Sequence, residues 1–126
     1  MVFGSKGAER TYRALKLWGD YQILAEHHVG SRLRLDYYLP EFKIGIEVQG
    51  TQHNEFNSKF HSGKDAFKDQ LRRDEHKREL CAEQGILYVS LEYPLIMKAT
   101  SEEDLLKKIL NRIEEARTQS KEDSDW

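Results

Sequence analysis

Hydrophobic and polar residues alternate along two neighbouring stretches, residues 33–39 and residues 44–49. The apolar positions are Leu33, Leu35, Tyr37 and Leu39 in the first stretch and Ile44, Ile46 and Val48 in the second. Side chains of a strand point to opposite faces in turn, so each stretch predicts a strand with one apolar face. Pro40 lies between them and has no amide hydrogen to donate, which marks a turn.

The remaining pattern predicts helices over residues 8–18, 64–84 and 101–117, with further strands over residues 21–29 and 87–91. The order α-β-β-β-α-β-α predicts an α/β fold with a mixed central sheet of about four strands flanked by helices. The first three strands form an antiparallel meander, and the fourth returns through a helix and pairs in parallel. We expect residues 1–118 to form a single domain and residues 119–126 a frayed acidic tail.

Composition narrows the class of protein. A chain of 126 residues with 33% charged and 38% hydrophobic residues fits one small α/β domain with a polar surface. The single cysteine, Cys81, excludes an internal disulfide framework and suits a reducing compartment. No apolar run is long enough to span a membrane, and no secretory segment follows Met1, so a cytoplasmic protein is expected.

The net charge of -2 conceals an uneven distribution. Residues 59–78 carry seven Lys or Arg against four Asp or Glu, whereas residues 101–126 carry five against eight. A basic segment of this kind keeps DNA binding open as a function, although the overall charge does not require it. The candidate phosphate contacts are Lys59, Lys64, Lys68, Arg72 and Arg73.

Each of the two central strands also carries a carboxylate on its polar face. Adjacent strands would bring Asp36 and Glu47 together, with Gln49 beside Glu47, and such a pair is costly unless a cation lies between them. Mg²⁺ is often held by one or two carboxylates and a substrate phosphate, and the carbonyl of Val48 could add a third protein ligand. The alternative is two exposed strand carboxylates balanced by nearby basic residues, namely Arg32, Arg34 and Lys43.

The long helix over residues 64–84 supplies an independent indication. Its spacing places one stripe of residues on a single side: Phe67, Leu71, Asp74, Arg78 and Cys81. An acid within a stripe that faces the sheet is expensive unless it is paired or linked to a metal, and Lys77 lies on nearly the same side as Asp74. The alternative is an ordinary helix ion pair between Asp74 and Arg78 or Lys77.

His53 and Glu9 complete the candidate residues. His53 follows the Glu47 strand closely, where a neutral imidazole could accept a proton from water or bind a metal. Glu9 lies early in the first helix, where an acid also simply complements the helix dipole. The histidine spacing matches no zinc pattern, and one cysteine cannot form a thiolate site.

The motifs SKGAER, DYYLP, IEVQGTQH and DAFKDQLRRDEHKRELCAEQGI resemble those of the PD-(D/E)XK nuclease superfamily. The likeness is closest to phage and intron-associated endonucleases related to very-short-patch repair endonuclease. The resemblance implies a restriction-endonuclease-like fold and a Glu-Asp-His-Asp site formed by Glu9, Asp36, His53 and Asp74. The family motif before the first helix is usually SKGE, whereas this chain has SKGAE.

The resemblance also implies roles for the remaining residues of the site. Glu47 would be the second acid that binds the metal. Gln49 stands where the superfamily most often has a lysine that positions the attacking water, and Lys77 would substitute for that lysine.

We therefore expect a DNA endonuclease that hydrolyses phosphodiester bonds with Mg²⁺, for which Mn²⁺ can substitute. We expect its specificity to depend on a homodimer, a larger phage or host protein partner, or a special DNA shape such as a nick, junction or mismatch. One alternative is a weak or inactive nuclease fold that serves as a DNA-binding accessory module. Another is a structural partner in a larger phage assembly that has no DNA role.

Overall fold

The computed structural model describes residues 3–30, 32–49 and 64–124. Within them, one four-stranded sheet has the order β1-β2-β3-β4. Its strands are β1 (Leu24–His28), β2 (Arg34–Leu39), β3 (Ile44–Gln49) and β4 (Leu87–Glu92). The first three strands pair antiparallel, and β4 pairs parallel with β3. These pairings confirm the predicted α/β fold and its mixed sheet.

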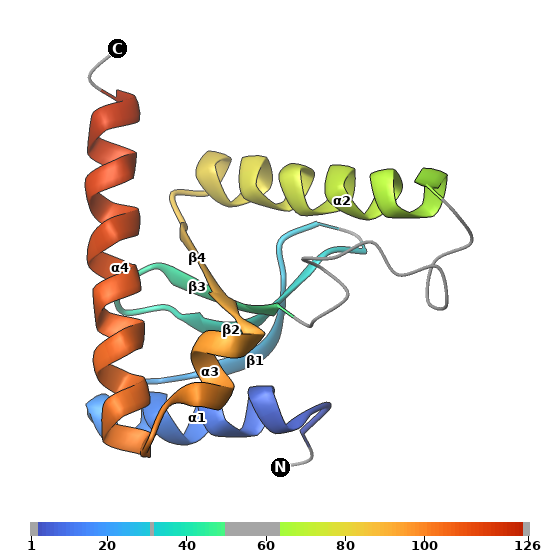
Figure 1. The fold of residues 1–126 in the computed structure, drawn as a ribbon. Coiled ribbons are helices and arrows are strands. Elements are labelled where there is room, and N and C mark those ends of the chain that lie inside the picture. The colour runs from blue at the N-terminus through green and yellow to red at the C-terminus, as the bar shows by residue number, and fades with distance from the viewer. Residues whose placement is uncertain (1–2, 31, 50–63, 125–126) are drawn as a thin grey trace.

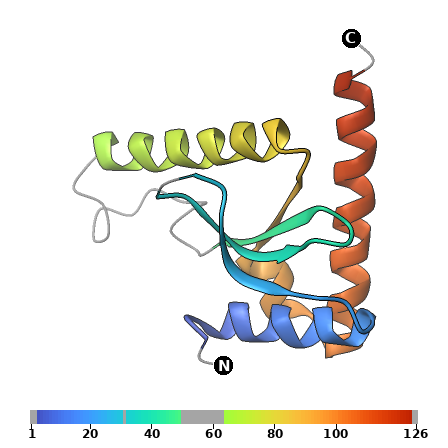
Figure 2. The same ribbon diagram turned by 180° about the vertical axis from the view of Figure 1, so that it is seen from behind.

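Helices cover the sheet on both faces and along one side. They are α1 (Lys6–Trp18), α2 (Lys64–Glu83), α3 (Tyr93–Lys98) and α4 (Glu102–Ser124). Helix α2 lies over one face, whereas α1 and α3 lie over the other, and the long α4 runs beside these layers (Figure 1). The view from behind shows the same order of layers, with α1 and α2 on opposite sides of the sheet (Figure 2).

The larger core lies between the sheet and the helices α1, α3 and α4. Leu15, Ile46 and Ile109 come from three of these elements and are almost completely buried there. A smaller apolar cluster lies beneath α2 and consists of Val29, Leu35, Cys81 and Ile86. Helix α2 is therefore held by fewer apolar contacts than the helices on the opposite face, because only the smaller cluster supports it.

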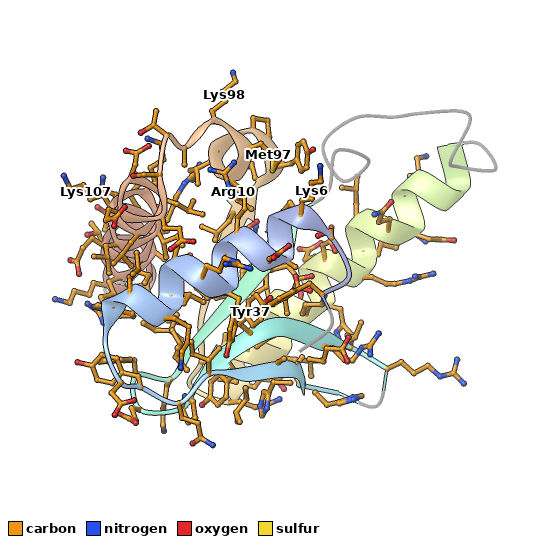
Figure 3. All side chains as sticks on the ribbon, turned by 90° about the horizontal axis from the view of Figure 1, so that it is seen from below. Lys6, Arg10, Tyr37, Met97, Lys98 and Lys107 are labelled. Carbon is orange, nitrogen blue, oxygen red and sulfur yellow. The ribbon has the colours of Figure 1, made fainter. Side chains whose placement is uncertain are left out.

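Hydrogen bonds fix α1 against its neighbours. The Arg10 guanidinium donates to the carbonyl oxygens of Met97 and Ala99 at 3.2 and 2.7 Å, and so satisfies carbonyls at the end of α3. The Tyr37 hydroxyl donates to the carbonyl oxygen of Ala8 at 2.8 Å. Figure 3 shows Tyr37 beneath α1 and Arg10 pointing toward Met97. These contacts set where the first turn of α1 lies relative to β2.

Several predicted boundaries were wrong. Strand β1 begins at Leu24 and not at Tyr21, because the Tyr21 ring packs edge-on against Trp18 and Phe42. The short helix α3 was not predicted because Pro94 suggested a break, yet proline suits the first turn of a helix. The predicted frayed tail is helical over residues 119–124, because α4 contains no Gly or Pro to end it earlier.

The predicted stripe on α2 was only partly right. Cys81 is completely buried, but Leu71 is 46% exposed and Arg78 is also exposed. Asp74 of the predicted stripe is half-buried, and the side of α2 that meets the sheet also includes Lys77, whose side chain is 12% exposed. No described helix is long and apolar enough to cross a membrane.

Candidate active site

The sheet forks at the two predicted carboxylates. Strands β2 and β3 pair from Leu39 with Ile44 to Tyr37 with Ile46, and the pairing ends there. Asp36 and Glu47 occupy the next positions, where β3 continues beside β4 alone. The Asp36 carboxylate spans the opening, because its Oδ2 accepts a hydrogen bond of 2.7 Å from the Val48 amide. A side chain thus replaces the main-chain partner that β2 would otherwise offer.

Glu47 is a buried acid whose two oxygens have different surroundings. Lys77 Nζ lies 2.9 Å from Oε1, and the side chains of Lys77 and Glu47 are only 12% and 10% exposed. No described residue donates a hydrogen bond to the buried Oε2. Burial, and then the negative charge of Asp36, raises the pKa of Glu47 to about 7, although Lys77 and a backbone hydrogen bond from Asp36 oppose the rise. A buried acceptor without a donor costs free energy, so a ligand that bound this oxygen would remove that cost.

One face of α2 covers the position where β2 and β3 separate. Gln70, Arg73, Asp74 and Lys77 follow the i, i+3, i+4, i+7 spacing that places side chains on the same side of a helix. Together with the strands they enclose a cleft of about 450 Å³, here called the fork cleft. Its other lining residues are Glu26, Arg32, Leu33, Arg34, Leu35, Asp36 and Glu47. Its acidic and basic side chains are equal in number, so the fork cleft combines cation-binding oxygens with phosphate-binding donors.

The donor set of the fork cleft fits a hard cation. The unpartnered Oε2 of Glu47 and the neighbouring Asp36 carboxylate are the kind of oxygens that Mg²⁺ binds. Among the described residues, no group of three or more His, Cys, Asp or Glu is arranged to hold a metal. The described part of the protein would thus supply two carboxylates, and water and a substrate phosphate would complete the shell, as is common for Mg²⁺.

The fork cleft brings together many of the residues predicted from the sequence. Asp36, Glu47, Asp74 and Lys77 all line it, as does Arg73 from the predicted phosphate contacts. The structure also bears on the alternatives. Glu47 is buried and pairs with Lys77, so the alternative of two exposed strand carboxylates is wrong. The alternative of an ion pair between Asp74 and Arg78 or Lys77 stays a prediction.

Other predicted residues lie away from this cleft. Glu9 pairs with Arg13 on α1 at 2.8 Å. The buried Gln49 lies opposite Glu92 of β4 and lines a second cleft, here called the Tyr88 cleft because Tyr88 also lines it. Lys68 and Arg72 are exposed and line neither cleft, and Arg72 pairs with Asp69 at 3.2 Å.

The rest of the predicted site lies beyond what the structure describes. His53, Lys59 and the side chain of Lys64 fall outside the described residues. The Val48 amide holds Asp36, and the role of the Val48 carbonyl as a metal ligand stays a prediction.

The cleft also contains residues that the sequence reasoning missed. Glu26 lies beside Asp36, because β1 and β2 pair in a register that sets Ala25 opposite Tyr37 and His27 opposite Leu35. Extending the hairpin pairing from the sequence would have revealed it. Gln70 carried a signal too, since it lies one helical turn before the predicted Asp74.

Comparisons with known proteins found relatives in viruses. No protein-family model matches the chain, and no solved structure matches it. The uncharacterized protein 307L of Invertebrate iridescent virus 6 is 39% identical over 61 residues, which cover 48% of this chain and 31% of that protein. The uncharacterized protein 033L of Invertebrate iridescent virus 3 is 38% identical over 66 residues, which cover 52% and 34%. The uncharacterized protein 094L of Frog virus 3 is 40% identical over 65 residues, which cover 51% and 42%. The chain thus spans less than half the length of these relatives.

Proposed function

We propose that this protein is a metal-dependent endonuclease that hydrolyses phosphodiester bonds in DNA. The observation that carries the proposal is the fork cleft, where Asp36, Glu47 and Lys77 meet and one Glu47 oxygen has no partner among the described residues. A buried acid beside a second acid and a lysine is an expensive arrangement that structure alone does not require. It is well suited to a reaction in which negative charge develops on a phosphate.

The chain's own residues have distinct roles in this proposal. Asp36 and the free oxygen of Glu47 would hold Mg²⁺, with Asp36 oriented by the Val48 amide. The ion, when bound, would lower the pKa of water and neutralise charge that develops on the phosphate. Lys77 holds the other oxygen of Glu47 and so fixes the direction of its carboxylate.

Two further groups would act on the substrate. Arg73 lines the cleft and would donate to non-bridging phosphate oxygens. His53 keeps its predicted role as the group that accepts a proton from the attacking water.

Cleavage of supercoiled plasmid with Mg²⁺ or Mn²⁺ tests the proposal. The variants Asp36→Asn and Glu47→Gln keep the side-chain shape but remove the charge, so we expect cleavage to fall at least about a hundredfold. Asp69→Asn is the matched control, because Asp69 is an exposed acid on α2 outside the fork cleft. DNA binding in EDTA should persist in all three variants. Cleavage that is equally fast in the two site variants and the control would refute the assigned site.

A second candidate function is that of a DNA-binding accessory module without catalysis. Gln49 favours it, because this buried amide turns toward the Tyr88 cleft and stands where the resembled superfamily most often has a lysine. This reading predicts salt-dependent DNA binding with no cleavage of supercoiled, linear, branched or mismatched DNA in Mg²⁺ or Mn²⁺. The plasmid assay therefore separates the two candidates.

A further inference from the structure

A second hollow adjoins the fork cleft along α2. This side cleft has a volume of about 670 Å³ and shares Arg32, Leu33 and Arg73 with the fork cleft. The rest of its described lining consists of Gly30, His76 and Leu80. Because the shared residues stand between the two hollows, a strand whose phosphate lay in the fork cleft could continue directly into the side cleft.

The side cleft differs from the fork cleft in its chemistry. Leu33, Leu80 and Gly30 provide an apolar floor, and Arg32, Arg73 and His76 provide the polar groups. No carboxylate belongs to its described lining, whereas acidic and basic side chains are balanced in the fork cleft. A ligand that fits the side cleft therefore carries negative charge at one end and a flat apolar surface at the other.

The two arginines are available for such a ligand. Arg34 lies 3.6 Å from Glu26, and Arg72 lies 3.2 Å from Asp69, so both of these guanidinium groups have carboxylate partners. Within the described part of the chain, Arg32 and Arg73 form no ion pair. Two guanidinium groups that are not engaged by carboxylates can each bind a phosphate through paired N–H donors.

We propose that the side cleft binds an unpaired nucleotide of the DNA strand that is cut. The base would lie against Leu33 and Leu80, and its phosphate would meet Arg32 and Arg73. Bases within a duplex stay stacked on each other, so duplex DNA offers phosphates but no apolar face for the floor. The inference rests on the proposed function and narrows its substrate to DNA with an unpaired nucleotide beside the scissile phosphate.

Gly30 keeps the apolar floor open. A Cβ atom at this position would lie 3.1 Å from Leu80 Cδ1 and nothing else nearby, so a larger residue would displace that side chain and fill the hollow. Gly30→Val therefore blocks the floor without changing any charge. This variant therefore separates the contribution of the base to binding affinity from that of the phosphate.

Fluorescence anisotropy in EDTA tests the inference with a short labelled oligothymidylate and the same strand annealed to its complement. We expect Arg73→Ala to weaken single-strand binding about tenfold and to reduce the slope of log K against log salt by about 0.7. Arg78→Ala removes the same charge from the same helix, where Arg78 lies over the Tyr88 ring and outside the side cleft, and should leave binding nearly unchanged. Gly30→Val should weaken single-strand binding about fivefold and leave duplex binding unaffected.

Equal effects of Arg73→Ala and Arg78→Ala on the single strand would overturn the inference. The inference would also be overturned if a Gly30→Val variant, shown by thermal melting to be folded, bound the single strand as tightly as the wild type. A protein that shows the expected binding pattern but cuts no DNA contradicts the proposed endonuclease function alone. If the protein cuts DNA but Arg73→Ala and Arg78→Ala bind the single strand equally well, the proposed nucleotide binding in the side cleft alone is contradicted.

Discussion

Replacing Lys77 with methionine isolates the electrostatics of the fork cleft. Methionine keeps most of the volume of the lysine side chain but removes its positive charge. Lys77 is the described cation closest to Glu47, at 2.9 Å, and both side chains are nearly buried. The variant therefore leaves Glu47 beside Asp36 without this neighbour, and the carboxyl must bind a proton or carry a costly buried charge.

The size of the effect follows from the pKa of Glu47. It is raised from 4.5 to about 7 in the fold, and each unit corresponds to about 1.36 kcal/mol. A raised pKa means that this carboxyl stabilises the fold fully below pH 4.5 and that this stability is lost as the pH rises through 7. The loss is roughly 3 kcal/mol at most. Lys77 lowers the pKa of Glu47, so its removal extends the loss to higher pH.

Urea denaturation in EDTA measures this difference as the free energy of unfolding. We expect Lys77→Met to be about 1–3 kcal/mol less stable than the wild type at pH 8, with a smaller difference at pH 5. The double variant Glu47→Gln with Lys77→Met should show little of this dependence on pH, because it lacks the titrating carboxyl. A Lys77→Met deficit of the same size at both pH values would refute the reasoning. So would a double variant that loses as much stability as the single one.

Three further predictions concern packing, reactivity and the cation. Gly45→Ala should destabilise the protein by about 1–3 kcal/mol in urea denaturation, because the added Cβ would lie 2.5 Å from Leu35 Cδ1 and 3.1 Å from Ile86 Cγ2. Unchanged stability would contradict the packing beneath α2. Cys81 is buried and burial raises the pKa of its thiol to about 11, so a thiol reagent at pH 8 should label it only after unfolding, and rapid native labelling would contradict its burial. Mg²⁺ at about a hundred times its dissociation constant should stabilise the wild type by about 2.7 kcal/mol in thermal melts, and an equal gain in Asp36→Ala would place the ion elsewhere.

The sequence was sufficient to predict the central carboxylates and the order of elements apart from the short helix α3. Apolar and polar residues alternate around Asp36 and Glu47, and this pattern can be recognised from neighbouring positions in the sequence alone. The two strands could therefore be predicted without knowledge of the tertiary structure. Lys77 was predicted for the same reason, because its position on the helix follows from its spacing to Asp74. The structure adds the partner of Lys77, since contact with Glu47 depends on how α2 packs over the sheet.

The error on α2 arose where tertiary contacts decide which residues are buried. The prediction of a buried stripe on α2 assumed that the helix contacts the sheet along its whole length, but Leu71 is exposed whereas Cys81 is buried. Helical periodicity gives the angle of a side chain around its helix and says nothing of the distance between helix and sheet. The fork itself was also beyond prediction, because the position where β2 and β3 separate depends on the pairing of β3 with β4.

The position of the fork argues for function more strongly than any one of its residues. Gly45 precedes Glu47 on the same face of β3 and lies against Leu35 and Ile86, so an apolar residue at position 47 would extend the apolar cluster beneath α2. Glu47 instead places an acid where Asp36 adds a second negative charge and where Oε2 meets no described donor. The negative charge of Asp36 helps to raise the pKa of Glu47, although Lys77 lies 2.9 Å from one Glu47 oxygen. A cation bound between Asp36 and Glu47 would offset this repulsion, and the same ion would then lie where a phosphate held by Arg73 could reach it.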